Sequence, residues 1–202
     1  MRATQDPVAV EIRHRAESLP DLAALAAVLP GCTACPELVA TRHCVVVGAT
    51  PAGARLLLMG EAPGAQEDLT GQPFVGRSGQ LLDRLLADVG IDRSAVAILN
   101  TVKCRPPANR PPTAVESRRC RGWTERQLDL IDPAVVVPLG LSATRWFLGP
   151  TTLSAARGRV HEVQGRRVLP TYHPSAALRW GPGGEPERLL RADLAEALRL
   201  AA

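Results

Sequence analysis

Short, strongly apolar runs alternate with amphipathic stretches along most of this 202-residue chain. The three clearest runs cover residues 54–59, 96–99 and 134–137. Apolar runs of this length, bounded by turn residues, are typical of strands that are buried on both faces of a sheet. Because neighbouring parallel strands are joined by crossover helices, the alternation predicts an α/β fold with a mostly parallel sheet.

Amphipathic segments between these runs are expected to be helices. Residues 8–29 place leucines near helical spacing, with Asp21 as a capping residue, and a Thr-x-x-Glu capping box opens residues 113–131. The other expected helices cover residues 78–89, 142–148 and 187–200. Weaker strand candidates are residues 45–47 and a hairpin formed by residues 159–163 and 167–169.

Length and composition suit one domain over residues 1–202, since 46% of the residues are hydrophobic. No apolar run is long enough to cross a bilayer, and Asp6 and Pro7 fall where a signal peptide would begin its apolar core. We therefore expect a monomeric, cytoplasmic protein without a membrane partner. The net charge of +4 permits binding to a polyanion such as DNA but does not require it.

Polar and aromatic residues follow several of the apolar runs. Glu61 and Phe74 come after the first run, Asn100 ends the second, and His173 follows the last strand candidate. Open α/β sheets bind ligands at the carboxyl ends of their strands. An aromatic ring beside carboxylates at that edge suits a flat, polar ligand such as a base.

Four of the five cysteines form a candidate metal site. Cys32 and Cys35 are a C-x-x-C pair, and fifteen residues separate Cys104 from Cys120. Four thiolates can hold a tetrahedral zinc ion or an iron–sulfur cluster. In the alternative interpretation only the C-x-x-C pair binds a metal and the other two are buried thiols. The fifth cysteine, Cys44, is expected to be a small core residue.

Four short motifs occur in order at compatible spacing. They are G-E-A-P-G-x-x-E-D from Gly60, G-x-P-F-V-G from Gly71, N-T-V-K-C-R-P-P from Asn100, and H-P-S from His173. Each motif alone is weak evidence, but the ordered set is specific. The chain resembles the family 4 uracil-DNA glycosylases over roughly residues 30–200, so the expected N-terminal helical segment lies partly outside the resemblance.

The resemblance implies a DNA-repair enzyme that hydrolyses the N-glycosidic bond of uracil in DNA and starts base excision repair. Such an enzyme must first turn the nucleotide out of the stack. The resemblance also implies a three-layer α/β/α domain with a four-stranded, mostly parallel sheet. The family's [4Fe–4S] cluster ligands match Cys32, Cys35, Cys104 and Cys120.

By the same resemblance, several residues have expected roles in binding and releasing uracil. Phe74 stacks on the flipped base, and the Asn100 amide matches O4 and N3–H of uracil but not the amino group of cytosine. His173 faces uracil O2, where negative charge develops. Glu61 orients water or offsets positive charge on the sugar. Ala62 belongs to the uracil pocket and stands where the best-known relatives have a water-positioning Asp.

Further residues are expected to connect loops or to contact DNA. The resemblance suggests that Glu67 pairs with Asn109 and so ties two active-site loops together, whereas Asp68 is interpreted as a turn residue. Leu178 is expected to enter the duplex as an apolar wedge, and Arg179 to hold phosphate or the minor groove. Possible further phosphate contacts are Lys103, Arg105 and Arg110.

Two other interpretations remain open from the sequence. The first is a relative that binds or covalently captures uracil-containing DNA without turnover. A branch of that kind carries a basic insertion with a His nucleophile, and residues 105–113 contain neither feature, which favours turnover. The second is a nucleotide-binding α/β protein with a zinc site and no role on DNA. His161 lies in a strand candidate and is interpreted as structural.

Overall fold

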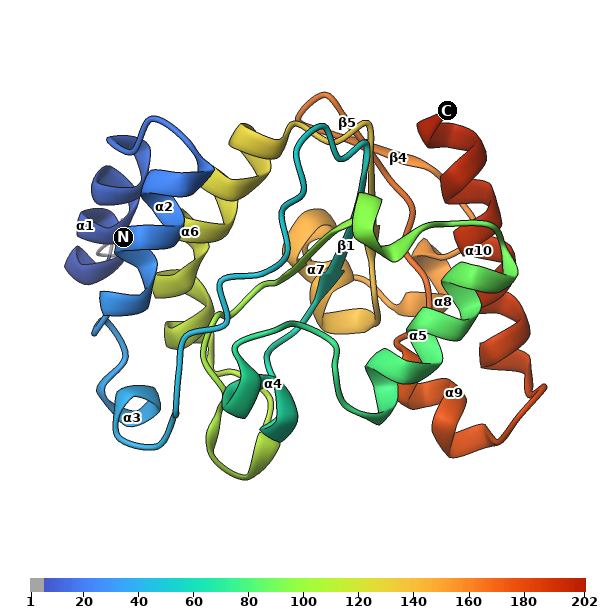
Figure 1. Cartoon of the computed structure of the whole chain (residues 1–202), viewed down its shortest axis with the longest axis horizontal. Helices are drawn as coiled ribbons and strands as arrows, with labels where there is room; N and C mark the ends of the chain where they lie inside the picture. The colour runs from blue at the N-terminus through green and yellow to red at the C-terminus, as the bar shows by residue number, and fades with distance from the viewer. Residues whose placement is uncertain (1–5) are drawn as a thin grey trace.

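The computed structural model describes residues 6–202, and its centre is a five-stranded sheet (Figure 1). The strands are β1 (Leu56–Gly60), β2 (Ala97–Asn100), β3 (Val135–Pro138), β4 (His161–Val163) and β5 (Arg166–Val168). Their order is β2-β1-β3-β5-β4. All neighbouring pairs are parallel except the edge pair β4–β5, which is antiparallel.

The sheet has five strands, so the expected number of four is wrong. The expected hairpin is present as β4 and β5, and its second strand pairs with β3 and thereby extends the parallel sheet. The expected strand at residues 45–47 is also absent. That segment runs beside the sheet with isolated backbone contacts, including Val46 N–H to Lys103 O at 2.8 Å.

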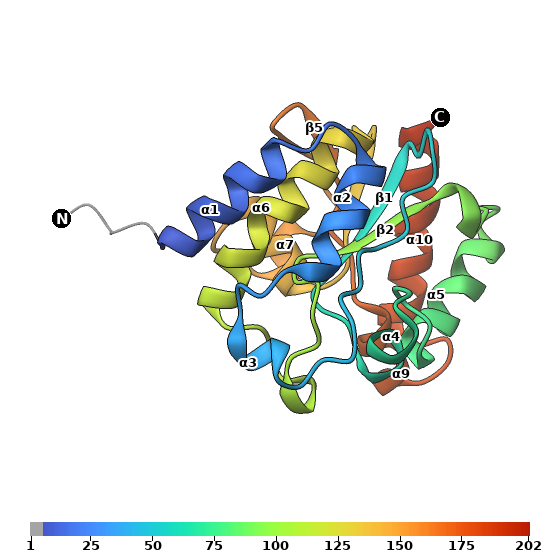
Figure 2. The same ribbon diagram turned by 60° about the vertical axis from the view of Figure 1, so that its left-hand side comes forward.

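Helices cover both faces of the sheet and give the expected three layers (Figures 1 and 2). The α-helices are α1 (Pro7–Glu17), α2 (Leu22–Val28), α3 (Pro36–Val39), α4 (Ala65–Thr70), α5 (Arg77–Asp88), α6 (Ala114–Ile131), α7 (Leu141–Leu148), α8 (Leu153–Ala156), α9 (Pro174–Trp180) and α10 (Glu185–Ala201). Short 3-10 helices are η1 (Leu29–Gly31), η2 (Arg93–Ala95) and η3 (Pro107–Asn109).

Alternate side chains of β1 point to opposite faces of the sheet. Leu56 and Leu58 belong to the core formed with α5, α9 and α10, whereas Leu57 and Met59 belong to the core formed with α6 and α7. A third apolar cluster joins α1, α2 and α3 to Trp123 of α6. None of the helices in residues 6–202 combines the length and apolarity needed to cross a membrane.

The expected helix over residues 8–29 is two helices, α1 and α2. Proline has no N–H for an intrahelical bond, and Pro20 lies between the two helices. The Asp21 side chain then accepts a hydrogen bond from Ala24 N–H at 2.7 Å and caps α2. The capping box expected for α6 is confirmed, because Thr113 and Glu116 each accept a hydrogen bond from the other's backbone N–H.

Candidate active site

The carboxyl ends of the central strands bring the expected base-binding residues to one edge of the sheet. Gly60 at the end of β1 is in register with Asn100 at the end of β2. The loop after β5 leads to His173, which is the N-cap of α9. Helices α4 and α9 both lie beyond this edge (Figure 2).

Phe74, Asn100 and His173 come together from three different segments. The ring centroids of Phe74 and His173 are 5.7 Å apart and their planes are tilted by 35°. A Cβ atom at Gly60 would clash with Asn100 Oδ1 and would lie 2.8 Å from Phe74 Cε2. The Asn100 and Phe74 side chains leave no room for a side chain at the last residue of β1, so the strand ends in glycine.

The Phe74 ring is held by an unusual backbone conformation. Phe74 is 6% exposed and has a φ of 54°, in the left-handed region that costs a residue with a Cβ about 1–2 kcal/mol. Gly79 of α5 lies so close that a Cβ there would clash with the Phe74 carbonyl. Arg93 donates to the Pro73 and Phe74 carbonyls at 2.8 and 3.2 Å. Strain fixed in this way is typical of ligand-binding loops.

Asn100 presents a buried acceptor without a protein partner. The residue is 3% exposed, and its Oδ1 has no hydrogen-bond partner within residues 6–202. Its backbone carbonyl accepts a hydrogen bond from Lys103 Nζ at 2.8 Å, which fixes the end of β2. An unpaired buried acceptor costs about 1–3 kcal/mol. A ligand that donates an N–H to Oδ1 would remove this cost.

His173 is oriented as a neutral donor. Its Nδ1 accepts a hydrogen bond from Ser175 N–H at 3.1 Å, so the neutral ring carries its proton on Nε2. Burial, followed by the nearby Arg179 charge, lowers the pKa of His173 to about 4, although Glu67 acts in the opposite direction. Gly140 leaves room for the ring, since a Cβ there would lie 3.0 Å from His173 Cβ.

This pKa predicts a dependence of folding stability on pH. The unfolded chain protonates His173 near pH 6.5, whereas the folded chain does so near pH 4. The contribution of neutral His173 to the free energy of unfolding is therefore fully present above pH 6.5, and it is lost as the pH falls toward 4. Between these pH values we expect the parent melting temperature to fall by roughly a few degrees more than that of His173→Gln. Melting temperatures of the parent and of His173→Gln that fall equally between pH 6.5 and 4 would contradict the lowered pKa.

Glu61 and Ala62 lie directly after β1 and are half-buried. The Glu61 backbone carbonyl accepts hydrogen bonds from Thr101 Oγ1 at 2.7 Å and Val102 N–H at 3.0 Å, which fixes the loop. Its carboxylate has no hydrogen bond or ion pair in the described part of the chain. Ala62 packs against the cluster that contains the cysteines. The loop therefore presents a free carboxylate without a neighbouring Asp.

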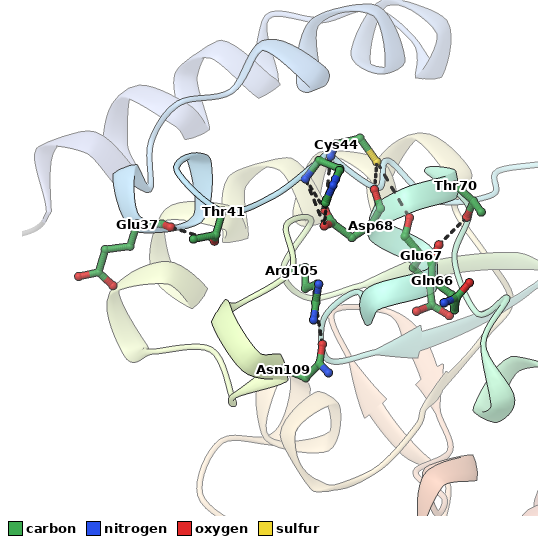
Figure 3. Close-up of polar contacts among 10 residues, drawn as sticks. Glu37, Thr41, Cys44, Gln66, Glu67, Asp68, Thr70, Arg105 and Asn109 are labelled. Atoms are coloured by element: carbon green, nitrogen blue, oxygen red, sulfur yellow. Dashed lines mark hydrogen bonds and ion pairs between the residues drawn. The ribbon is translucent and has the colours of Figure 1, made fainter.

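Glu67 ties two loops together through the backbone. Its Oε2 accepts a hydrogen bond from Gly64 N–H at 3.0 Å, and its Oε1 accepts from Val75 and Gly76 N–H at 2.9 and 2.8 Å. The expected pair with Asn109 is not formed in the structure. Asn109 Oδ1 instead accepts a hydrogen bond from Arg105 Nε at 2.7 Å, on a separate loop (Figure 3).

The residues expected to contact DNA differ in their exposure. Arg179 is exposed, and Leu178 is half-buried against the core beneath α9. Lys103 is buried and bonded to the Asn100 carbonyl, so its interpretation as a phosphate contact is wrong. Arg110 forms a two-pronged ion pair with Glu116, at 2.9 and 2.7 Å.

Cys32, Cys35, Cys104 and Cys120 line one pocket. They are free thiols: Cys32 and Cys35 lie in the loop between η1 and α3, Cys104 lies in the loop after β2, and Cys120 lies on α6. Two donors already face the sulfurs: Arg42 Nη1 lies 2.9 Å from Cys104 Sγ, and Lys103 N–H lies 3.3 Å from Cys120 Sγ. Such donors stabilise thiolates, which are the form that binds metal.

A single metal ion and an iron–sulfur cluster differ in the distance between the thiolates that bind them. Thiolates around a single zinc ion are about 3.8 Å apart, as the edges of a tetrahedron with ~2.3 Å bonds. Among residues 6–202, no three His, Cys, Asp or Glu side chains are gathered closely enough for one metal ion. An iron–sulfur cluster with four iron atoms separates its four thiolates further. The four sulfurs that line the pocket have the chemistry to hold either kind of group.

Burial makes Cys35 and Cys120 poor anions without a positive partner. It raises the pKa of Cys35 to about 11 and that of Cys120 to about 12. A bound metal group supplies the missing positive charge and binds the thiolate form. Cys44 lies outside this pocket, half-buried, with its Sγ 2.9 Å from the Asp68 carbonyl.

Comparison with known proteins decides the family. A model described as the uracil DNA glycosylase superfamily matches residues 47–196. The chain belongs to this superfamily. A type-4 uracil-DNA glycosylase from Thermotoga maritima is 43% identical over 169 residues, which cover 82% of this chain and 87% of the relative. Another type-4 uracil-DNA glycosylase, from Archaeoglobus fulgidus, is 42% identical over 73% of this chain and 78% of the relative.

A type-5 uracil-DNA glycosylase from Pyrobaculum aerophilum is also similar, at 35% identity over 86% of this chain and 89% of the relative. Several type-4 relatives at 37–43% identity confirm the resemblance to family 4 glycosylases.

Several residues that shape the glycosylase site could not be identified from sequence motifs. Gly79 and Gly140 matter because of close approaches between distant segments. Arg93 acts through carbonyl groups of the Phe74 loop. Ser175 is the exception, since its place in the H-P-S motif signalled a role, and it fixes the His173 tautomer.

Proposed function

We propose that this protein hydrolyses the N-glycosidic bond between uracil and deoxyribose in DNA, which starts base excision repair. One observation carries the proposal: Phe74, the unpaired Asn100 Oδ1 and the neutral His173 ring converge at one edge of the sheet. Membership of the uracil-DNA glycosylase superfamily supplies the substrate class.

Recognition of the base uses Phe74 and Asn100. The ring of Phe74 stacks on the extruded uracil, a contact worth roughly 1–3 kcal/mol. Asn100 Oδ1 accepts the uracil N3–H, and its amino group donates to O4. Cytosine has no N3–H and carries an amino group at position 4, so it would leave the buried Asn100 amide unpaired. Ala62 completes the pocket wall without contributing a polar group.

Bond cleavage leaves negative charge on the base and positive charge on the sugar. His173 Nε2–H donates a hydrogen bond to uracil O2, and this contact strengthens as the bond breaks. The free Glu61 carboxylate offsets the oxocarbenium-like charge or orients the water that adds to C1′. The departing uracil anion then takes a proton from solvent. Ala62 stands where the best-known relatives have a water-positioning Asp, so Glu61 is the one carboxylate of this loop that the proposal assigns to the reaction.

The four cysteines are proposed to hold a [4Fe–4S] cluster. Bound there, the cluster serves as a structural cross-link and takes no part in the hydrolysis. It joins the N-terminal segment, the loop after β2 and α6, which also share the apolar cluster around Trp123 and polar contacts such as the Arg119–Asp6 ion pair. Arg42 is placed to compensate negative charge on the sulfur of Cys104.

Contacts with DNA are assigned to α9. Leu178 serves as the wedge that fills the space left by the extruded nucleotide, and Arg179 holds phosphate beside it. Uracil-containing DNA is the partner, and the chain acts as a monomeric, single-domain enzyme in the cytoplasm. The mild positive charge of the chain is consistent with this partner.

Release of free uracil tests the proposal. With labelled uracil-containing DNA in excess, the iron-loaded enzyme is expected to release many equivalents of uracil and leave abasic sites. DNA that stays bound or covalently attached after one equivalent would instead support the capturing relative. Absence of both binding and release would contradict a uracil-specific function.

Specificity is expected to depend on Asn100. In Asn100→Asp the carboxylate can accept from the cytosine amino group but cannot donate to uracil O4. We expect uracil excision to fall and discrimination against cytosine to weaken, each by about tenfold to a hundredfold. Single-turnover rates on matched uracil and cytosine duplexes measure both changes. A variant that excises uracil as fast as the parent would show that Asn100 does not recognise the base.

A further inference from the structure

Asp68 is a fully buried carboxylate, although its sequence context suggested an ordinary turn residue. Its exposed fraction is 0%, and it lies on α4 directly after Glu67. The carboxylate accepts hydrogen bonds from His43 N–H at 3.0 and 3.1 Å and from Cys44 N–H at 3.4 Å. His43 Nδ1 lies 3.0 Å from the same group. Burial of an unpaired carboxylate costs free energy, so Asp68 depends on the hydrogen bonds from His43 and Cys44, which lie before β1.

Helix α4 depends on such bonds because it has little apolar packing. It is six residues long, and isolated helices of this length are not stable. Its one large apolar side chain, Leu69, is 60% exposed. Asp68 therefore fixes α4 to the segment around Cys44 (Figure 3), and Glu67 fixes it to the Phe74 loop.

The two carboxylates connect the cysteine pocket to the Phe74 loop. Arg42 donates to Cys104 Sγ at 2.9 Å and to the Cys32 carbonyl at 2.7 Å. The next residues along the chain, His43 and Cys44, are bonded to Asp68. From the adjacent position on α4, Glu67 reaches the two backbone N–H groups that follow Phe74.

We propose that Asp68 is a positioning residue that transmits the order of the four-cysteine site to the base-binding loop. Its role rests on the proposed function of that loop. Phe74 has a strained backbone, so it needs support from outside its own segment. Through Asp68, α4 and Glu67, the cysteine site supplies part of that support and becomes more than a remote stabiliser of the fold.

Asp68→Asn tests the link, because the amide is nearly the same size but loses the charge and one acceptor oxygen. We expect iron content and visible cluster absorption to match those of the parent. Hydrogen exchange at the Val75 and Gly76 amides should become faster, since helix α4, which carries Glu67, is then held less firmly. Single-turnover uracil release should slow by about tenfold to a hundredfold, as misplacement of a binding group does.

Asp129→Asn is the matched control. Asp129 is an exposed carboxylate on α6 that accepts a hydrogen bond from Arg166 Nη2 at 2.9 Å and has no contact with α4 or the Phe74 loop in the described residues. It should leave the exchange at Val75 and Gly76 unchanged.

Glu67→Gln breaks the same connection as Asp68→Asn. The fold loss in single-turnover rate of the double variant is therefore expected to be clearly smaller than the product of the losses in the two single variants.

His43→Ala supplies a second test should Asp68→Asn fail to fold. It removes the Nδ1 contact from an exposed side chain but retains the backbone bonds, so a smaller change in the same direction is expected. Parent-like exchange at Val75 and Gly76 together with parent-like release in the folded variants overturns the proposal. A variant whose uracil release slows only in proportion to the iron that it has lost also overturns the proposal. If the parent releases no uracil, the proposed function fails, and the exchange result still decides whether Asp68 orders this loop.

Discussion

His173→Ala is expected to slow single-turnover release of uracil by about 10²–10³-fold, in line with the loss of one oxyanion donor. The neutral Nε2–H is aimed by the hydrogen bond from Ser175 N–H to Nδ1, so the donor is in place before the bond breaks. A contact that strengthens only in the transition state affects the chemical step and not substrate binding. Rapid-quench cleavage and a separate DNA-binding titration measure the two effects.

His161→Ala is the matched control for this prediction. His161 lies on β4 and its Nε2 is 2.8 Å from the Ala156 carbonyl, a structural contact outside the base-binding edge. We expect its cleavage rate to stay near that of the parent. Parent-like cleavage by His173→Ala, or a loss explained entirely by weaker DNA binding, would remove His173 from the proposed chemistry.

Local sequence patterns predicted much of the fold. The buried strands β1, β2 and β3 appear as continuous apolar runs, and α6 begins at the predicted capping box. The number of strands was wrong because the pairing of β5 with β3 joins segments about thirty residues apart. No local pattern specifies whether a hairpin extends a sheet or stands apart from it.

The site was only partly predictable for a related reason. Strand-end positions correctly suggested that Asn100, Phe74 and His173 meet, because the carboxyl ends of parallel strands share one edge. Burial of a charged group cannot be read from its neighbours in the chain. Lys103 and Asp68 therefore looked like surface residues, although each is buried by partners that the fold supplies.

The second large effect is expected for Cys120→Ser, which should remove the cluster and lower the melting temperature by about 10 °C or more. Cys120 lies on α6, whereas its partners come from the loop between η1 and α3 and from the loop after β2, so the cluster would cross-link segments far apart in sequence. Serine is nearly the same size but is a poor ligand for iron. Iron analysis, visible absorption and thermal melting measure the loss.

Cys44→Ser provides the internal comparison, because Cys44 is the one cysteine outside the pocket in the described structure. It should retain iron and melt close to the parent. Full iron content in both Cys32→Ser and Cys120→Ser would contradict a site built from four cysteines. Iron loss with uracil release intact would preserve the cysteine site but contradict its proposed link to the Phe74 loop. Cluster loss and Asp68→Asn should therefore both accelerate exchange at Val75 and Gly76, whereas only cluster loss should strongly lower the melting temperature.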